Sequence, residues 1–375
     1  MKTISTRLLS ACLFAGLFFS SIQVAAAGNP FNYGVGINYD AWAQAWYPTA
    51  TPAQVTSKVS GQIKSLLTKF RLIHLYRLNG WDKICGNGAN AASDPVTQTA
   101  LSVIQAWNTK APTKNVEVTL GTSVGQVFAM ASGNNGCTGE QYATAFVNAL
   151  VQNAPFSGNT ANVLNTIKTI TLGNELDTVA DMTPSILTAA ITNFYTALNA
   201  AGLGEIPLTI SLANVSQKNT FGTFPSTVSD ALAQAVVSSW QSSWNGNVPF
   251  LFANQYPSTV SALSAYIVAA NAYNQSYTTD GGVTYPLKNL TLLVGETGFN
   301  STSKTNGGDA GEAAYINAIF PAMTGPTPLA PALLIFEGFD EQLKAAGQNK
   351  MGIFSIKTNA LKTGISIPVT VRTSE

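Results

Sequence analysis

The strongest constraint on the fold is the regular alternation of two kinds of segment along the chain. Eight short runs are rich in β-branched residues, and several are nearly continuous apolar stretches, as in parallel strands buried on both faces. The longer segments between them place apolar residues at helical spacing. The alternation indicates an α/β fold. The strand-like runs cover residues 33–39, 71–77, 115–121, 167–173, 207–212, 248–254, 289–295 and 330–336.

The helical pattern is clearest in two of the intervening segments. Between residues 55 and 70, six apolar side chains fall on one helical face. Thr183 and Pro184 predict the start of a second helix, and Gly202 predicts its end. Strands and helices in this order predict a single (β/α)₈ TIM-type barrel, which needs about 250 residues.

Extended βα loops account for the rest of the 375 residues. The alternative, an open doubly wound sheet, is less favoured because no G-x-G-x-x-G turn follows the first strand. The candidate loops are rich in Gly, Asn, Thr and Ser and cover residues 82–94, 122–137, 213–227 and 277–288.

The N-terminus has the pattern of a secretory signal peptide. Lys2 and Arg7 precede an apolar run over residues 8–19, and small residues follow up to Ala27. We expect cleavage after Ala27, which leaves residues 28–375 as one domain, secreted or periplasmic. Elsewhere no stretch reaches the roughly 20 apolar residues of a membrane helix, so we expect no membrane span in the mature chain.

Composition excludes several classes of function. Lys and Arg number 19 and Asp and Glu number 18, a balance that argues against nucleic acid as a partner. One histidine and three cysteines leave no histidine-rich zinc site, and we expect no metal and no organic cofactor. After removal of the signal peptide, Cys85 and Cys137 remain. In an oxidising compartment we expect a disulfide between them, the alternative being two unrelated thiols.

Three carboxylates stand directly at the ends of apolar strands, namely Glu175, Glu296 and Glu337. In a (β/α)₈ barrel the strand ends form the active site. Two carboxylates facing one cleft can cleave a glycosidic bond, because one protonates the leaving oxygen and the other attacks the anomeric carbon or activates water. A capping or ion-paired acid is the alternative for each residue alone. Their position on separate strands favours the functional interpretation.

Motifs across nearly the whole mature chain resemble glycoside hydrolase family 17, the β-1,3-glucanases and their glucan-transferase relatives. G-E-T-G followed by F-D-E-x-x-K is a specific combination, whereas G-N-E also occurs in related barrel glycosidases. Phe299 stands where the family usually has tryptophan after G-E-T-G. The matching segments are GVGINYD (34–40), TLGNELD (171–177), ANQYP (253–257), VGETGF (294–299), FEGFDEQLK (336–344) and GIF (352–354).

The resemblance implies a role for four residues. Glu175 is then the general acid/base and Glu296 the nucleophile, while Glu341 and Lys344 orient the site. Asn174, beside the acid, is expected to bond the sugar 2-hydroxyl, the alternative being a turn amide.

Other side chains are weaker candidates for substrate contact. Tyr256 is expected to bond the nucleophile or a sugar, and Tyr39 and Tyr76 to line the cleft, although aromatic residues at barrel mouths often serve packing. Glu337 and Phe299 are also expected at the substrate. His74, inside an apolar run, is expected to be a core residue.

The paired carboxylates together with the resemblance imply a retaining enzyme that acts on β-1,3-glucan, as polysaccharide or oligosaccharide. With water as acceptor it hydrolyses, and with a sugar hydroxyl as acceptor it transfers glucan. We expect a monomer. The alternatives are a non-catalytic secreted glucan-binding protein on the same barrel and a barrel glycosidase for another β-glycan.

Overall fold

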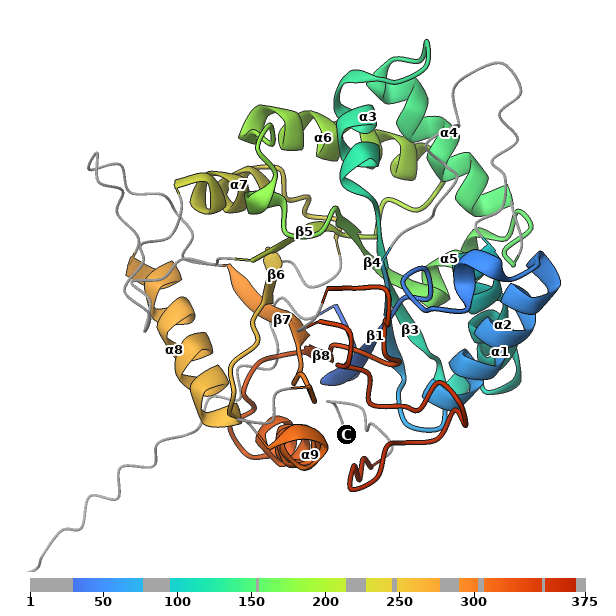
Figure 1. Cartoon of the computed structure of the whole chain (residues 1–375). Coiled ribbons are helices and arrows are strands. Elements are labelled where there is room, and N and C mark those ends of the chain that lie inside the picture. The colour runs from blue at the N-terminus through green and yellow to red at the C-terminus, as the bar shows by residue number, and fades with distance from the viewer. Residues whose placement is uncertain are drawn as a thin grey trace, which may run out of the picture.

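A closed barrel of parallel strands forms the centre of the computed structural model (Figure 1). The strands are β1 (Val35–Tyr39), β2 (Leu72–Leu75), β3 (Glu117–Gly121), β4 (Ile167–Leu172), β5 (Leu208–Leu212), β6 (Phe250–Asn254), β7 (Thr291–Thr297) and β8 (Leu333–Ile335). They follow one another around the barrel in sequence order, and β1 closes it by pairing in parallel with β8. The predicted (β/α)₈ barrel is confirmed. The structure describes residues 30–76, 95–152, 155–213, 227–244, 248–276, 290–302, 307–345 and 348–368.

Helices surround the barrel, as the coloured ring in Figure 1 shows. The face predicted over residues 55–70 is buried, and the side chain of Thr51 caps the helix by accepting from Gln54. Thr183 caps the helix that begins at Pro184, as predicted. The helices are α1 (Pro52–Leu66), α2 (Pro95–Lys110), α3 (Val124–Ser132), α4 (Gly139–Gln152), α5 (Thr160–Thr166), α6 (Pro184–Ala200), α7 (Thr227–Ser238), α8 (Val260–Ser276) and α9 (Gly308–Thr324).

Three of the predicted loops and the N-terminal segment fall largely or wholly on residues that the structure does not describe. Residues 82–94, 277–288 and the segment 1–27 lie outside the described residues, as does all but the ends of 213–227. The prediction of a loop over 122–137 is wrong in part, because Ser123 caps helix α3 there through a capping box with Gln126. Among the described residues, no helix is long and apolar enough to cross a membrane.

The alternation of side chains along β1 decides which residues lie inside the barrel. A Cβ at Gly36 would come within 2.6 Å of Leu334 and Leu72, so only glycine fits at this point. Asn38, two residues on, therefore also points inward, where its Oδ1 lies 2.7 Å from Nδ1 of His74. His74 is a buried core residue, as predicted, and burial lowers its pKa to about 3.

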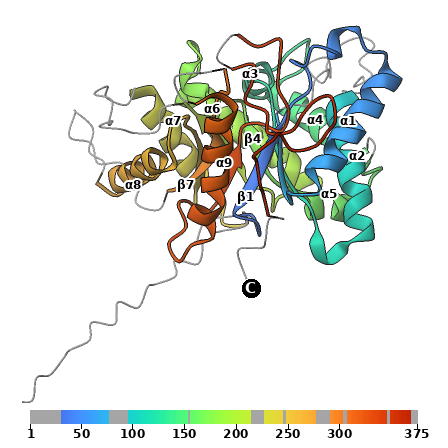
Figure 2. The same ribbon diagram turned by 60° about the horizontal axis from the view of Figure 1, so that its bottom comes forward.

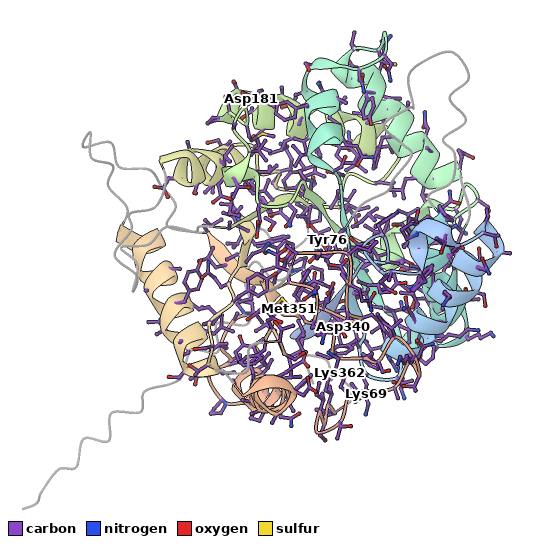
Figure 3. The ribbon with its side chains drawn as sticks, viewed as in Figure 1. Lys69, Tyr76, Asp181, Asp340, Met351 and Lys362 are labelled. Atoms are coloured by element: carbon purple, nitrogen blue, oxygen red, sulfur yellow. The ribbon has the colours of Figure 1, made fainter. Side chains whose placement is uncertain are left out.

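The segment that follows β8 is tied to α9 by a partly buried ion-pair network. Nζ of Lys362 lies 3.3 Å from Glu312 of α9 and 3.0 Å from Asp340. Figure 2 shows α9 in front of the barrel with the C-terminal segment beside it, and Figure 3 labels Asp340 and Lys362. Burial raises the pKa of Glu312 to about 7, although the ammonium of Lys362 lowers it in part.

This raised pKa predicts a pH dependence of stability. The folded protein keeps a proton on Glu312 that the unfolded chain releases, so the free energy of unfolding falls as pH rises from about 4.5 to about 7. Glu312→Gln should make this fall shallower in urea titrations across that window. Glu140→Gln, which removes an exposed carboxyl, is the matched control. An unchanged slope in Glu312→Gln would contradict the assignment.

Candidate active site

A cleft of about 850 Å³ opens at the C-terminal ends of the strands. Its walls come from segments that are far apart in the sequence, and Figure 3 shows two of its residues, Tyr76 and Met351, near the middle of the ring of helices. This is the end of the barrel where the βα loops meet, so the carboxylates predicted at strand ends lie where the fold provides a cavity. The lining includes Asp40, Tyr76, Thr122, Asn174, Glu175, Tyr256, Glu296, Phe299, Phe336, Lys344 and Met351.

Glu296, near the end of β7, is held by two tyrosine hydroxyls. Tyr76 donates to Oε1 at 2.7 Å, and Tyr256 donates to Oε2 in a short hydrogen bond. Glu296 is only 4% exposed, whereas Tyr256 is 43% exposed. Each hydrogen bond to a charged group contributes about 1.5–3 kcal/mol, and both of these favour the ionised carboxylate because both oxygens accept.

The electrostatic balance at Glu296 is dominated by burial, which raises its pKa to about 7. The hydrogen bonds from Tyr256 and Tyr76 lower the pKa, Glu175 raises it, and the ammonium of Lys344 lowers it. Burial and the charge of Glu296 also raise the pKa of both tyrosines well above the usual range. The two hydroxyls therefore remain donors over the whole physiological pH range.

Glu175 lies in the sharp turn that follows β4. Its backbone is left-handed, with φ 50° and ψ 49°, and Gly173 two residues earlier has φ 64°. Nδ2 of Asn254 lies 3.2 Å from Oε1 of Glu175 and 3.2 Å from Oδ1 of Asn174. Glu175 and Glu296 thus line one cleft.

Asn254, at the end of β6, is a contact that sequence reasoning missed. The register between β6 and β7 shifts after Ala253, which places Asn254 opposite Glu296. A Cβ at Gly295 would approach Oδ1 of Asn254 to 2.7 Å, so the glycine leaves room for the amide. The sequence could have indicated Asn254, because it stands at the end of an apolar strand, two residues before Tyr256 in the ANQYP segment.

Phe336, which follows β8, is a second residue that sequence reasoning missed. Its ring makes edge contacts with Tyr76 and Tyr256, at centroid distances of 6.2 and 5.8 Å. The ammonium of Lys344 lies 4.5 Å from the centre of the same ring. Phe336 thus packs against both tyrosines that bind Glu296, and it lines the cleft although it is largely buried.

Two of the predicted site residues, Glu337 and Glu341, do not line the cleft. Both are buried, at 1% and 0% exposure, so the prediction that Glu337 touches substrate is wrong, whereas the orienting role of Glu341 stays a prediction. Glu341 forms an ion pair with Lys344, and Lys344 does line the cleft. Burial, followed by the charge of Glu341, raises the pKa of Glu337 well above its usual range. Glu337 therefore favours the protonated form.

Tyr39 is also wrongly predicted as a cleft residue. Because Gly36 and Asn38 point into the barrel, Tyr39 points outward, where its hydroxyl donates to Gln62 of α1 at 2.8 Å. It is 1% exposed and absent from the lining. By contrast, Tyr76, Asn174, Tyr256 and Phe299 all line the cleft.

The predicted disulfide and the metal prediction concern residues that are only partly described. Cys137 is disulfide-bonded, whereas Cys85 lies outside the described residues, so their pairing stays a prediction. Within the described ranges, His, Cys, Asp and Glu form no group suited to a metal ion.

Comparisons with known proteins agree with the fold and the motifs. A family model for glycosyl hydrolases family 17 matches residues 115–362. A structure described as one of two plant β-glucan endohydrolases with distinct substrate specificities is 21% identical, with a TM-score of 0.56, over 88% of this chain and 99% of that one. An endo-laminarinase from Formosa Hel1_33_131 is 14% identical, with a TM-score of 0.52, over 88% and 84%. A search of curated proteins found no match.

The two tyrosine hydrogen bonds predict how the pKa of Glu296 responds to mutation. Tyr76→Phe removes a donor that lowers this pKa, so the carboxyl should titrate above about 7. Infrared difference spectra against Glu296→Gln, recorded across a pH series, isolate the carboxylate band. Tyr315→Phe is the control, since its hydroxyl contacts Thr297 rather than Glu296. A pKa that stays constant or falls in Tyr76→Phe would refute the stated cause.

Proposed function

Because the chain belongs to glycosyl hydrolases family 17 and is a glycoside hydrolase, we propose that it cleaves β-1,3-glucan with retention of anomeric configuration. The observation that carries the proposal is the pair of carboxyl groups in one cleft, Glu175 and Glu296, in different environments. Glu296 is buried and fixed at both oxygens, whereas Glu175 is half-buried in a turn at the end of β4.

The proposed reaction has two displacements. In the first, an oxygen of Glu296 bonds to the anomeric carbon while the glycosidic C–O bond breaks, and Glu175 gives its proton to the leaving oxygen. In the second, Glu175 takes a proton from water, whose oxygen bonds to the anomeric carbon, and the carboxylate of Glu296 leaves. A sugar hydroxyl in place of water gives transglucosylation. Retention requires carboxyl groups about 5–5.5 Å apart.

The hydrogen bonds at Glu296 support its assignment as the nucleophile. A raised pKa alone suits a proton donor, which favours the reversed roles. However, both oxygens of Glu296 accept hydrogen bonds from tyrosines, so a proton on either oxygen would weaken the one that this oxygen accepts. The contacts therefore favour a carboxylate at this position, as nucleophilic attack requires.

The substrate assignment rests on the motifs and on the family. One structural neighbour is described as a plant β-glucan endohydrolase and another as an endo-laminarinase, and we extend the β-glucan substrate class of the first to this chain. The exposed ring of Tyr256 provides an apolar surface on which a sugar ring can stack, whereas Phe299 and Phe336 line the cleft but are largely buried. A glycosidase for another β-glycan is the alternative.

We further propose that the enzyme is exported and that it is a monomer. Residues 1–27 act as a signal peptide, the domain spans residues 28–375, and Cys85 pairs with Cys137 in the oxidising compartment. Mass spectrometry of the non-reduced secreted protein tests the cleavage site and the disulfide. It should give an N-terminus at Gly28, and no free thiol at Cys85 or Cys137.

Product sizes test the substrate class and the fate of the intermediate. Incubation with linear β-1,3-oligosaccharides should yield shorter products, and products longer than the substrate would reveal transfer. Proton NMR of the first products should show the β-anomer before mutarotation. Unchanged oligosaccharide would contradict the substrate assignment, and an initial α-anomer would contradict retention.

A pair of variants separates the roles of the two glutamates. Glu296→Gln should lose activity on every substrate, because the group that attacks carbon is gone. Glu175→Gln should lose activity on glucan yet still react with a dinitrophenyl β-glucoside, whose leaving group needs little protonation. Azide should then release the trapped intermediate as a β-glycosyl azide. If azide instead accelerates Glu296→Gln to a β-glycosyl azide and leaves Glu175→Gln unaffected, the roles are reversed.

A further inference from the structure

The turn that carries Glu175 is held in an unfavourable backbone conformation. Residues with a side chain adopt the left-handed region only at a cost in free energy, and Glu175 has φ 50°. Leu176, the next residue, is fully buried, and its side chain fills the space where a Cβ of Gly173 would lie, 2.4 Å away. The direction of the Glu175 side chain therefore depends on contacts that keep this turn in place.

Asp177, two residues after Glu175, supplies such contacts. Its Oδ1 accepts from the backbone N–H of Ala213 at 2.9 Å, at the end of β5, and its Oδ2 accepts from the hydroxyl of Ser229 on α7 at 2.9 Å. Both carboxylate oxygens are thus used to attach the turn to two other elements. A charged acceptor makes these bonds stronger than those between neutral groups.

The attachment continues from Ala213 to the other glutamate. The carbonyl of Ala213 accepts from Nε2 of Gln255 at 2.9 Å, and the backbone N–H of Gln255 donates to the carbonyl of Glu296 at 2.8 Å. A chain of three hydrogen bonds therefore connects the segment after β4 with β7, through the ends of β5 and β6. We call this chain the Asp177–Gln255 relay.

We propose that Asp177 is a positioning residue, which through this relay sets the carboxyl of Glu175 against the bond that Glu296 attacks. The inference rests on the proposed roles of the two glutamates. Asp177 itself neither gives nor takes a proton in the reaction. A small displacement of a proton donor greatly slows the transfer, so loosening the turn should affect the steps that need Glu175 and spare those that do not.

Asp177→Asn tests the proposal, because it keeps the size of the side chain but replaces one acceptor oxygen by a donor. With linear β-1,3-oligosaccharides, kcat should fall on the order of tenfold to hundredfold. The release of dinitrophenol in the first turnover of the aryl glucoside should stay within about threefold of wild type, since this step needs little protonation. Azide should accelerate subsequent turnover by the variant and not by wild type.

Asp181→Asn is the matched control, because Asp181 is exposed on the same segment and lies at the periphery in Figure 3. It should behave as wild type in all three measurements. If Asp177→Asn does not fold, Ser229→Ala removes a single donor to Asp177 and should give the same pattern with a smaller loss.

The outcomes distinguish this inference from the proposed function. If Asp177→Asn loses equal activity on both substrates, Asp177 has only a structural role. If it keeps full activity on oligosaccharides, the relay is dispensable. Either result overturns the inference. Glu175→Gln in the same assays reports on the proposed function alone. The inference is supported only when Glu175→Gln shows azide rescue and Asp177→Asn shows a weaker form of it.

Discussion

The burial of the Glu296 carboxylate is the constraint on which the arrangement of the site depends, because its lost hydration must be replaced by contacts with other side chains. A carboxylate loses most of its hydration in such a position, and ion-dipole contacts must replace it. The replacements come from three different strand ends, with Tyr76 after β2, Tyr256 after β6 and Lys344 after β8. Only a closed barrel brings these ends around one carboxyl, so the chemistry of the cleft depends on the pairing of β1 with β8.

Much of this arrangement could be predicted from sequence patterns, and the two residues that the sequence analysis missed, Asn254 and Phe336, share one cause. Apolar runs predicted the strands, and their ends predicted Glu175 and Glu296 at the cleft, because a strand end is a local property; Tyr256 was expected from the resemblance of ANQYP. The direction of a side chain past that end is not local, since it changes wherever the register shifts. The shift after Ala253 places Asn254 opposite Glu296, and the shift between Val294 and Thr297 precedes the point where Phe336 lines the cleft.

The errors at Tyr39 and Glu337 show two further limits. Tyr39 follows the strict alternation of β1, and the need for glycine at position 36, which reveals the inward face, arises from side chains of β2 and β8. Glu337 is next to a cleft residue in sequence, yet it is buried with Glu341 behind the lining. At both positions the residue type is one that often contacts sugars, and only the packing of other segments keeps its side chain out of the cleft.

The partial exposure of Tyr256 gives the site a property that a fully enclosed carboxylate would lack. Its ring faces the cleft while its hydroxyl holds Glu296. Under the proposed function, a glucan chain in the cleft would displace water from this tyrosine, and a hydrogen bond to a charged group strengthens when the local dielectric constant falls. The hydrogen bond from Tyr256 to Glu296 would then be stronger in the occupied cleft than in the empty one.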